Sequence, residues 1–124
     1  MELKFFKCKH CGQIVYKVKN TEVPLICCGE IMQELVAGIE DASHEKHVPC
    51  HEVSGGVLKV NVGAVEHPML AEHYIEWVAV RTNKTIYLTN LNPTEKPYAE
   101  FVLKENEEVE EVFAYCNLHG LWKA

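Results

Sequence analysis

Alternation of hydrophobic and polar residues is the main pattern in the second half of the chain. Residues 57–62 (Val-Leu-Lys-Val-Asn-Val) alternate directly after the turn-forming run Ser54-Gly55-Gly56. A period of two residues is typical of strands with one buried face. The segments that read as strands are residues 57–62, 74–81, 85–91, 98–104 and 110–115. The short polar turn at residues 83–84 predicts a hairpin, and the series as a whole predicts an antiparallel β-sandwich from residue 48 onward.

The N-terminal part of the chain contains shorter segments that are typical of strands. Residues 3–6 and 13–18 look like brief strands beside a cysteine-containing loop. A segment this short cannot bury enough apolar surface to offset its conformational entropy without a metal or disulfides. Residues 38–46 form a polar connector with room for one helical turn. We therefore predict two all-β domains, residues 1–37 and residues 38–124.

Composition and charge narrow the class of protein. The chain has 124 residues, of which 48% are hydrophobic, and a formal net charge of -6, which is typical of a compact protein of one or two small domains and argues against binding to nucleic acid. No apolar run approaches the roughly 20 residues needed to span a bilayer, and the first residues lack the apolar core of a signal peptide. We expect a cytoplasmic protein. Six cysteines in that compartment indicate metal ligands rather than disulfides.

Four of the six cysteines form one candidate metal site. Cys8 and Cys11 are separated by two residues, and the adjacent pair Cys27 and Cys28 follows further along the chain. Four thiolates can surround one ion tetrahedrally and leave it no open position. Because two ligands on consecutive residues cannot share a relaxed loop, we expect some distortion of the tetrahedron. Sulfur-only sites bind zinc or iron, and both identities stay open here.

The C-terminal residues supply a second candidate site. Cys116 and His119 lie two residues apart, and three earlier histidines, His47, His67 and His73, fall at the ends of predicted strands or in loops. A rigid sandwich presents functional groups at such positions. Five soft or borderline ligands exceed the four that close a structural zinc site. The surplus predicts a redox-active iron with one open octahedral position for a small molecule.

The motifs around these ligands resemble those of the desulfoferrodoxin family, the two-iron form of superoxide reductase, along nearly the whole chain. The matching motifs are Cys8-x2-Cys11 with Cys27-Cys28, Glu45-Lys46-His47-Val48-Pro49, Val65-Glu66-His67-Pro68-Met69, His73-Tyr74-Ile75-Glu76-Trp77 and Cys116-Asn117-Leu118-His119-Gly120. The resemblance implies a small desulforedoxin-like β domain followed by an immunoglobulin-like antiparallel β-sandwich, with two such chains forming a homodimer. It implies one-electron reduction of superoxide to hydrogen peroxide, without release of oxygen, and a small electron donor such as rubredoxin.

The resemblance also implies roles for individual residues. The equatorial nitrogen ligands of a mononuclear non-haem iron would be His47, His67, His73 and His119, with Cys116 as the axial ligand. Cys8, Cys11, Cys27 and Cys28 would hold the other iron. Lys46 would attract and orient superoxide, and Glu45 would occupy the sixth position of the oxidised iron. Cys50 departs from the family pattern because it is not a ligand there.

Other interpretations of the same residues remain open at this level. The chain could be a rubredoxin-like electron carrier whose second metal site is not catalytic, or a metal-binding or sensor protein without catalysis. The remaining histidines, His10, His44 and His51, are expected to face solvent. Cys50 is expected to be a small buried side chain. Trp77 and Trp122 are expected to fill apolar space in or beside the sandwich, and either could instead screen a bound iron from water.

Overall fold

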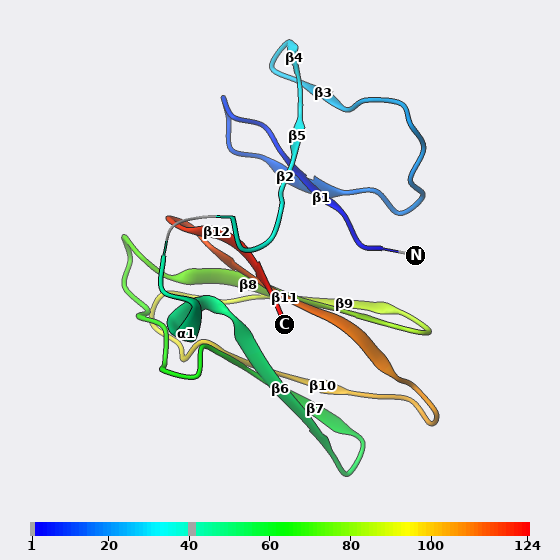
Figure 1. Cartoon of the computed structure of the whole chain (residues 1–124), viewed down its shortest axis with the longest axis vertical. Coiled ribbons are helices and arrows are strands. Elements are labelled where there is room, and N and C mark those ends of the chain that lie inside the picture. The colour runs from blue at the N-terminus through cyan, green and yellow to red at the C-terminus, as the bar shows by residue number, and fades with distance from the viewer. Residues whose placement is uncertain (1, 40–41) are drawn as a thin grey trace. The chain divides into compact units, whose positions relative to one another are not determined.

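The computed structural model describes residues 2–39 and 42–124, and the regular secondary structure of these residues is almost entirely β-strand (Figure 1). The chain divides into two compact units, Met1–Val36 and Ala37–Ala124. Within the described residues, no helix is both long and apolar enough to cross a membrane. The two units carry different kinds of sheet, and each is best understood by itself.

The first unit consists of two very small antiparallel sheets. Strand β1 (Phe5–Lys7) lies between β2 (Ile14–Tyr16) and β5 (Gln33–Glu34), and β3 (Ile26–Cys27) pairs with β4 (Glu30–Ile31). Its buried side chains are few: Leu3, Phe5, Cys8 and Met32. The two strands predicted at residues 3–6 and 13–18 are present in shortened form, whereas β3 to β5, each two residues long, were not predicted.

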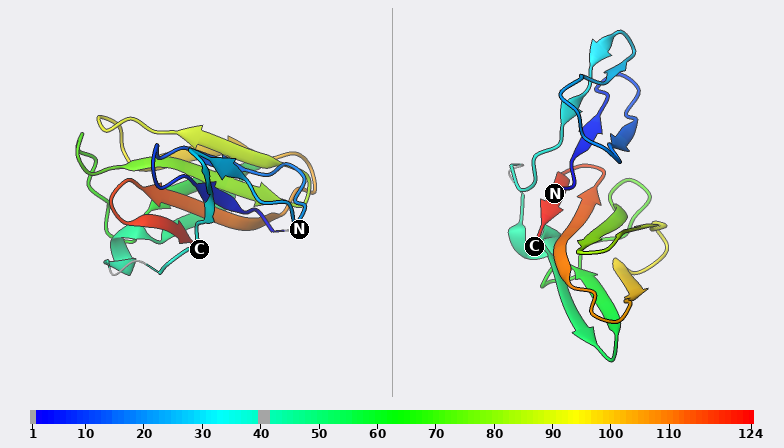
Figure 2. Two further views of the ribbon diagram at one scale, coloured as in Figure 1. Left: turned by 90° about the horizontal axis from the view of Figure 1, so that it is seen from above. Right: turned by 90° about the vertical axis from the view of Figure 1, so that its right-hand side faces the viewer.

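The second unit is a sandwich of two antiparallel sheets, drawn one above the other in Figure 1 and from two further directions in Figure 2. The three-stranded sheet has the order β10-β7-β6 and the four-stranded sheet the order β12-β11-β8-β9. The strands are β6 (Pro49–Ser54), β7 (Val57–Val62), β8 (Ile75–Thr82), β9 (Ile86–Asn90), β10 (Tyr98–Val102), β11 (Val109–Cys116) and β12 (Gly120–Lys123). Two packed sheets of three and four short strands match the predicted immunoglobulin-like architecture.

Alternate residues of facing strands form the core between the sheets. Leu58, Val60 and Val62 of β7 are almost fully buried, as the alternation predicted. The other members of the cluster are Ile75, Val78, Val80, Leu91, Ala99, Phe101, Val112, Ala114 and Cys116. Cys116 thus ends a strand whose inward side is already fixed by packing. The packed core therefore fixes the position of this candidate ligand at the end of β11, an internal strand of the sheet.

An irregularity in β8 lies next to this strand end. Tyr115 pairs with Trp77, but the next residue, Cys116, pairs with Ile75, so Glu76 is an extra residue in β8. This bulge turns Ile75, rather than Glu76, into the core, and Ile75 is fully buried. Bulges of this kind redirect side chains beside functional sites.

Two elements of the second unit lie outside the strands that were predicted from the sequence. The connector contains the four-residue helix α1 (His44–His47), where one helical turn was expected. Strand β12 was not predicted, because Leu121 and Trp122 are followed only by Lys123 and Ala124 and the segment shows too little alternation. It pairs with β11 over four residues and closes the turn that contains His119.

Candidate metal centres

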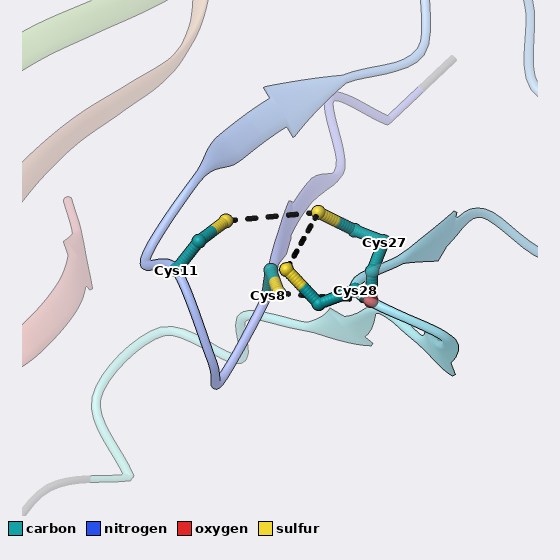
Figure 3. Close-up of side chains that lie close together, drawn as sticks. All are labelled: Cys8, Cys11, Cys27 and Cys28. Carbon is teal, nitrogen blue, oxygen red and sulfur yellow. Dashed lines mark hydrogen bonds between the residues drawn. The ribbon is translucent and has the colours of Figure 1, made fainter.

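The four cysteines of the first unit point toward one another (Figure 3). The Sγ atoms of Cys11 and Cys27 are 3.6 Å apart, those of Cys27 and Cys28 are 4.0 Å apart, and all four sulfurs lie within 4.8 Å of one another. Sulfurs at the corners of a tetrahedron around zinc would be separated by about 3.8 Å, since the metal–sulfur bond is about 2.3 Å. The four thiols therefore fit one tetrahedral ion.

The adjacent pair of ligands distorts the backbone. Cys28 has φ of 53°, in the left-handed region that residues other than glycine rarely adopt. This conformation costs of the order of 1 kcal/mol or more and turns two consecutive side chains toward one point. The strain found here lies in the main chain, and the expected distortion of the tetrahedron itself stays a prediction.

The thiols of this site cannot all lose their protons without a cation. Hydrogen bonding from the backbone N–H of Cys11 lowers the pKa of Cys8 to about 6. The hydrogen bonds that Cys27 makes with the sulfurs of Cys8 and Cys11 raise its pKa to about 12, and the same partners raise the pKa of Cys28. Thiolates this close together repel one another. A divalent ion that replaces the protons would neutralise the repulsion between the thiolates, which is the behaviour expected of a metal site.

The second site brings together five donor groups from four separate segments. His47 ends α1, His67 follows β7, His73 precedes β8, Cys116 ends β11, and His119 lies in the turn before β12. Donor atoms of the first four residues lie within 4.8 Å of one another. Nδ1 of His119 is 3.1 Å from Nε2 of His47 and 3.9 Å from Sγ of Cys116. All five residues predicted as ligands of one ion therefore meet in the folded chain.

The tautomers of two histidines leave lone pairs facing each other. Nδ1 of His47 lies 2.6 Å from the carbonyl oxygen of Ser43, and Nδ1 of His67 lies 2.7 Å from that of Pro68. A carbonyl oxygen only accepts, so each Nδ1 carries the proton and each Nε2 presents a lone pair. The two Nε2 atoms are nevertheless 3.1 Å apart. With no proton between them this contact is repulsive, and a cation bound by both nitrogens would make it attractive.

A third ring, that of His73, shows the same need for a partner. Its Nε2 is buried and, among the described residues, has no hydrogen-bond partner. Buried polar atoms in folded proteins are almost always satisfied. A metal ion at the centre of the histidines would satisfy this nitrogen in the same way as those of His47 and His67.

The four imidazole rings lie at the corners of a square. Neighbouring ring centroids are separated by 4.6, 4.7, 5.1 and 4.9 Å in the order His47, His67, His73, His119 and back to His47. The diagonal from His47 to His73 is 6.3 Å. Nitrogens on neighbouring corners would be about 3.0 Å apart around an ion with bonds of about 2.1 Å, which agrees with the distances found here. The rings thus suit four equatorial positions, and Cys116 supplies a fifth donor.

Backbone packing joins the segments that carry His47 and His67. The N–H of Val65 donates to the carbonyl of Glu45 over 3.0 Å, and that of Gly63 to the carbonyl of Val48 over 3.1 Å. Gly63 has φ of 88°, and a Cβ added there would lie 2.3 Å from the oxygen of Val65. Only glycine fits this position, so the approach of α1 to the following loop depends on it.

Burial sets the protonation of the ligands before any metal binds. Removal from water lowers the pKa of His67 to about 4 and lowers the pKa values of His47 and His73. These rings are therefore neutral near pH 7 and have lone pairs available. Burial raises the pKa of the Cys116 thiol, and the backbone N–H groups of Leu118 and His119 act in the opposite direction. A metal ion bound here would displace one proton, from Cys116.

Trp122 contributes to this site in a way that goes beyond the filling of apolar space, or the screening of a metal from water, expected from the sequence. It is almost fully buried and stacks on the ring of His47, with centroids 4.9 Å apart. Its Nε1–H donates to the carbonyl oxygen of His119 over 3.0 Å. One indole therefore restrains two of the five ligand residues. The sequence signal that could have revealed this role is its position three residues after His119.

Glu45 and Lys46 both occupy exposed positions on α1. Burial is the main cause of the lowered pKa values of His47 and His73, and the positive charge of Lys46 acts in the same direction. Among the described residues, the carboxylate of Glu45 is not part of the group of clustered donors. The roles predicted for both residues stay predictions.

The remaining predicted side chains lie outside both clusters. His10, His44 and His51 are exposed, as expected. Cys50 is exposed on β6, so the expectation that it would be a buried side chain is wrong. It occupies the second position of an edge strand, and its side chain points away from the core. Its Sγ makes one long contact of 4.0 Å to the carbonyl of Val48.

The fold and the two sites define a β protein with one closed tetrathiolate metal site and one mixed imidazole–thiolate metal site. The family model for Desulfoferrodoxin matches residues 39–124, which is more than half of the chain. The chain belongs to the desulfoferrodoxin family.

Individual relatives extend the match to the whole chain. Desulfoferrodoxin from Nitratidesulfovibrio vulgaris is 42% identical over 99% of this chain and 96% of the relative. The crystal structure of the superoxide reductase from Treponema pallidum superposes with a TM-score of 0.85 at 37% identity and covers 100% of this chain and 99% of its own. The one-iron superoxide reductase from Giardia intestinalis covers 64% of this chain and 95% of its own, with a TM-score of 0.57 at 28% identity.

Proposed function

We propose that this chain is a superoxide reductase, which converts superoxide to hydrogen peroxide by adding one electron and two protons, without releasing oxygen. The observation that carries the proposal is the set of imidazole lone pairs that converge on one point beside a cysteine sulfur. Similarity to proteins described as superoxide reductases supports the same activity.

The five donors of the second site fit an iron ion with one position left for substrate. When bound, such an iron supplies the electron, because it alternates between the ferrous and ferric states. The chain's own contribution is to set the charge: the lowered pKa values of His47, His67 and His73 keep these rings neutral. Only the Cys116 thiolate then offsets the charge of a ferrous ion, so a formal +1 remains to attract a monoanion.

Lys46 and Glu45 are proposed to act at different stages of the reaction, Lys46 when superoxide arrives and Glu45 after the metal has been oxidised. The ammonium of Lys46, on the exposed side of α1 near His47 and His73, attracts superoxide and orients it. Lys46, or water held near it, is also the proposed proton source for the product. Glu45 is proposed to reach the sixth metal position after oxidation, when the site has gained one positive charge.

The first unit is proposed to hold a redox-active iron that passes electrons rather than binding substrate. Four thiolates fill a tetrahedral ion completely and give a ferrous ion a formal charge of -2, which repels superoxide. We assign this function to the domain predicted at residues 1–37 and the reductase reaction to residues 38–124. A small reductant such as rubredoxin in the cytoplasm is the proposed donor, and a homodimer is the proposed assembly.

Anaerobic purification followed by metal analysis and a superoxide assay tests the function. We expect two irons per chain and one peroxide formed per superoxide consumed when a reductant is present, with no oxygen evolved. His73→Ala should abolish this activity, and His51→Ala, which removes an exposed histidine outside the site, should retain it. Oxygen evolution would identify a dismutase. Reversible electron uptake without superoxide consumption would identify an electron carrier.

A further inference from the structure

Asn117 connects the strand end that carries Cys116 with the loop that carries His73. Its Oδ1 accepts a hydrogen bond from the backbone N–H of Tyr74 over 3.0 Å, and its Nδ2 donates to the carbonyl oxygen of Glu72 over 3.0 Å. Its own backbone N–H donates to the carbonyl of Tyr74 over 3.2 Å. The residues on both sides of His73 are thus held by one amide side chain.

His73 needs such a restraint more than its neighbours do. The rings of His47 and His67 are each fixed by a hydrogen bond from Nδ1 to a carbonyl oxygen. Within the part of the chain that the structure describes, the buried Nε2 of His73 has no hydrogen-bond partner. Its main chain forms two hydrogen bonds with Leu70, of 2.9 and 3.0 Å, which close a tight loop but do not attach that loop to the sandwich.

The residue that attaches this loop, Asn117, lies in the sequence between two of the candidate metal ligands. Asn117 directly follows Cys116, the last residue of β11, and precedes His119 by two residues. The β-bulge at Glu76 displaces the start of β8 from regular pairing with β11 at this place. The side chain of Asn117 therefore bridges the two strands just beyond the point where the regular ladder ends.

We infer that Asn117 is a positioning residue that sets His73 against the metal by clamping residues 72 and 74 to the end of β11. Through this clamp the position of the His73 imidazole is tied to that of the Cys116 sulfur. The inference rests on the metal site of the proposed function but not on the identity of its substrate. Asn117 itself is not one of the clustered donor residues.

The test compares Asn117→Ala with Asn83→Ala. Asn83 forms the same kind of clamp in the turn after β8, at the opposite end of that strand from His73: its Oδ1 accepts from the N–H of Glu108 over 2.8 Å, and its Nδ2 donates to the carbonyl of Asn106 over 3.4 Å. Both substitutions remove two hydrogen bonds between backbone segments. Only the first should act on a metal ligand.

The main measurement is the rate at which iron is lost from the full-length, iron-loaded protein to the chelator ferrozine. Loss of partners that orient metal ligands typically weakens binding by about 10- to 100-fold. We expect the second iron of Asn117→Ala to leave faster by roughly that factor, with a changed electron paramagnetic resonance signal of the oxidised site. The signal of the four-thiolate iron should stay unchanged as an internal reference, and Asn83→Ala should match wild type.

A second measurement needs no metal. In the metal-free protein, the amide hydrogen of Tyr74 should exchange faster in Asn117→Ala than in wild type, because its acceptor is gone. If Asn117→Ala does not fold, Asn117→Asp serves instead, since it loses the donor to Glu72, and faster iron release is expected from it too. Iron release at the wild-type rate, or equal acceleration by Asn83→Ala, would overturn the role of Asn117 alone. A wild-type protein that binds no second metal would overturn the site itself.

Discussion

The two metal centres place their ligands by opposite means. Cys8, Cys11, Cys27 and Cys28 lie on two short loops within 21 positions of the chain, and the unit around them has few buried apolar side chains. The ligands of the second centre are spread from His47 to His119 and meet only because the sandwich brings four segments together. In the first unit the metal organises the fold, and in the second the fold organises the metal site.

The difference shows where the free energy of each site originates. The sandwich has an apolar core of twelve buried residues and therefore has its own driving force for folding. That core can hold neutral imidazoles in a repulsive arrangement until a cation arrives. The first unit has no such reserve, and it uses the metal to compensate for the strained φ of Cys28 and for its small core.

Removal of both metals should reveal this difference between the two units most clearly. We expect the first unit to unfold, because binding of a structural metal supplies about 10–16 kcal/mol to domains of this kind, while the sandwich remains folded. Amide hydrogen exchange on the metal-free protein measures both units at once. Protected amides in β1 and β2 without metal would show that the small core suffices. Loss of protection in β7 and β11 would show that the sandwich depends on its metal too.

Gly63→Ala should damage the second centre and spare the first. The added Cβ would lie 2.3 Å from one carbonyl oxygen and 2.6 Å from another, and the φ of 88° is strained for alanine. We expect a loss of about 3 kcal/mol or more in the free energy of unfolding of the sandwich, together with loss of the second metal. Denaturant unfolding followed by metal analysis measures both effects.

The matched control is Gly55→Ala in the turn between β6 and β7. Gly55 also has a positive φ, of 60°, but an added Cβ would meet nothing within 4 Å. Its cost should be limited to conformational strain of about 1 kcal/mol. Equal destabilisation by the two substitutions would mean that the tight approach of α1 to the loop before His67 is unimportant.

The same contrast explains what the sequence could predict. Cysteine spacing is local, so the four-thiolate cluster could be proposed from residues 8–28 alone. The core strand β7 followed from its alternation. The residue types of His47, His67 and His73 suggested a shared site, but the family resemblance was needed to support their convergence, because no local rule brings separate loops together. The orientations of the His47 and His67 rings depend on the carbonyl oxygens of Ser43 and Pro68, and these contacts have no signature in the sequence.

The bulge at Glu76 and the stacking of Trp122 on His47 could not be predicted for a related reason. Both depend on contacts between segments that are distant in sequence, and alternation describes only one strand at a time. The two-residue strands β3 to β5 are too short to show any period. The exposure of Cys50 was predicted wrongly because a general tendency of cysteine was applied to an edge strand.

Acid should weaken the metal-free sandwich through its histidines. The pKa of His67 is lowered to about 4 in the folded state, whereas an unfolded histidine titrates near 6.5. Between these values the unfolded chain binds more protons, so stability is present at neutral pH and is lost as the pH falls from about 6.5 toward 4. Urea unfolding of the metal-free protein across this range measures the slope.

Substitution of the buried ring identifies the source of that slope. His67→Gln should flatten the pH dependence, and His51→Gln, at an exposed position of β6, should leave it unchanged. An unaltered slope in His67→Gln would mean that other groups cause the acid sensitivity. The thiols of the first unit do not enter this measurement if that unit is already unfolded without metal, which the hydrogen-exchange experiment establishes.

Lys46→Gln should affect the imidazole–thiolate centre, which has a position left for substrate, and should spare the four-thiolate centre, which has none. Removal of one positive charge near His47 and His73 should lower the second-order rate with superoxide by up to about tenfold at low ionic strength and reduce its dependence on salt. Lys59→Gln on β7 makes the same change in net charge away from the site. Identical rates and salt slopes for the two variants would remove Lys46 from the mechanism. The spectrum of the four-thiolate iron should be unaffected by either.

The smallest expected effect concerns a carboxylate that joins the two cysteine loops. Glu30 contacts Nζ of Lys9 at 2.9 Å and Nε2 of His10 at 2.8 Å, and these interactions lower its pKa. Lys9 and His10 lie between two ligands on one loop, and Glu30 follows the ligands of the other. Because these side chains are exposed, such ion pairs are weak and are screened by salt. We expect Glu30→Gln to accelerate loss of the first metal only a few-fold at low salt.

The salt dependence separates a weak electrostatic link from a structural one. At about 1 M salt, where screening acts over roughly 3 Å, wild type and Glu30→Gln should release the first metal at the same rate. Glu34→Gln, on the neighbouring strand β5, provides a control with the same change in charge. A large effect of Glu30→Gln that persists at high salt would mean that this carboxylate organises the loops before the metal binds. The contrast between a metal-organised unit and a fold-organised site would then have to be abandoned.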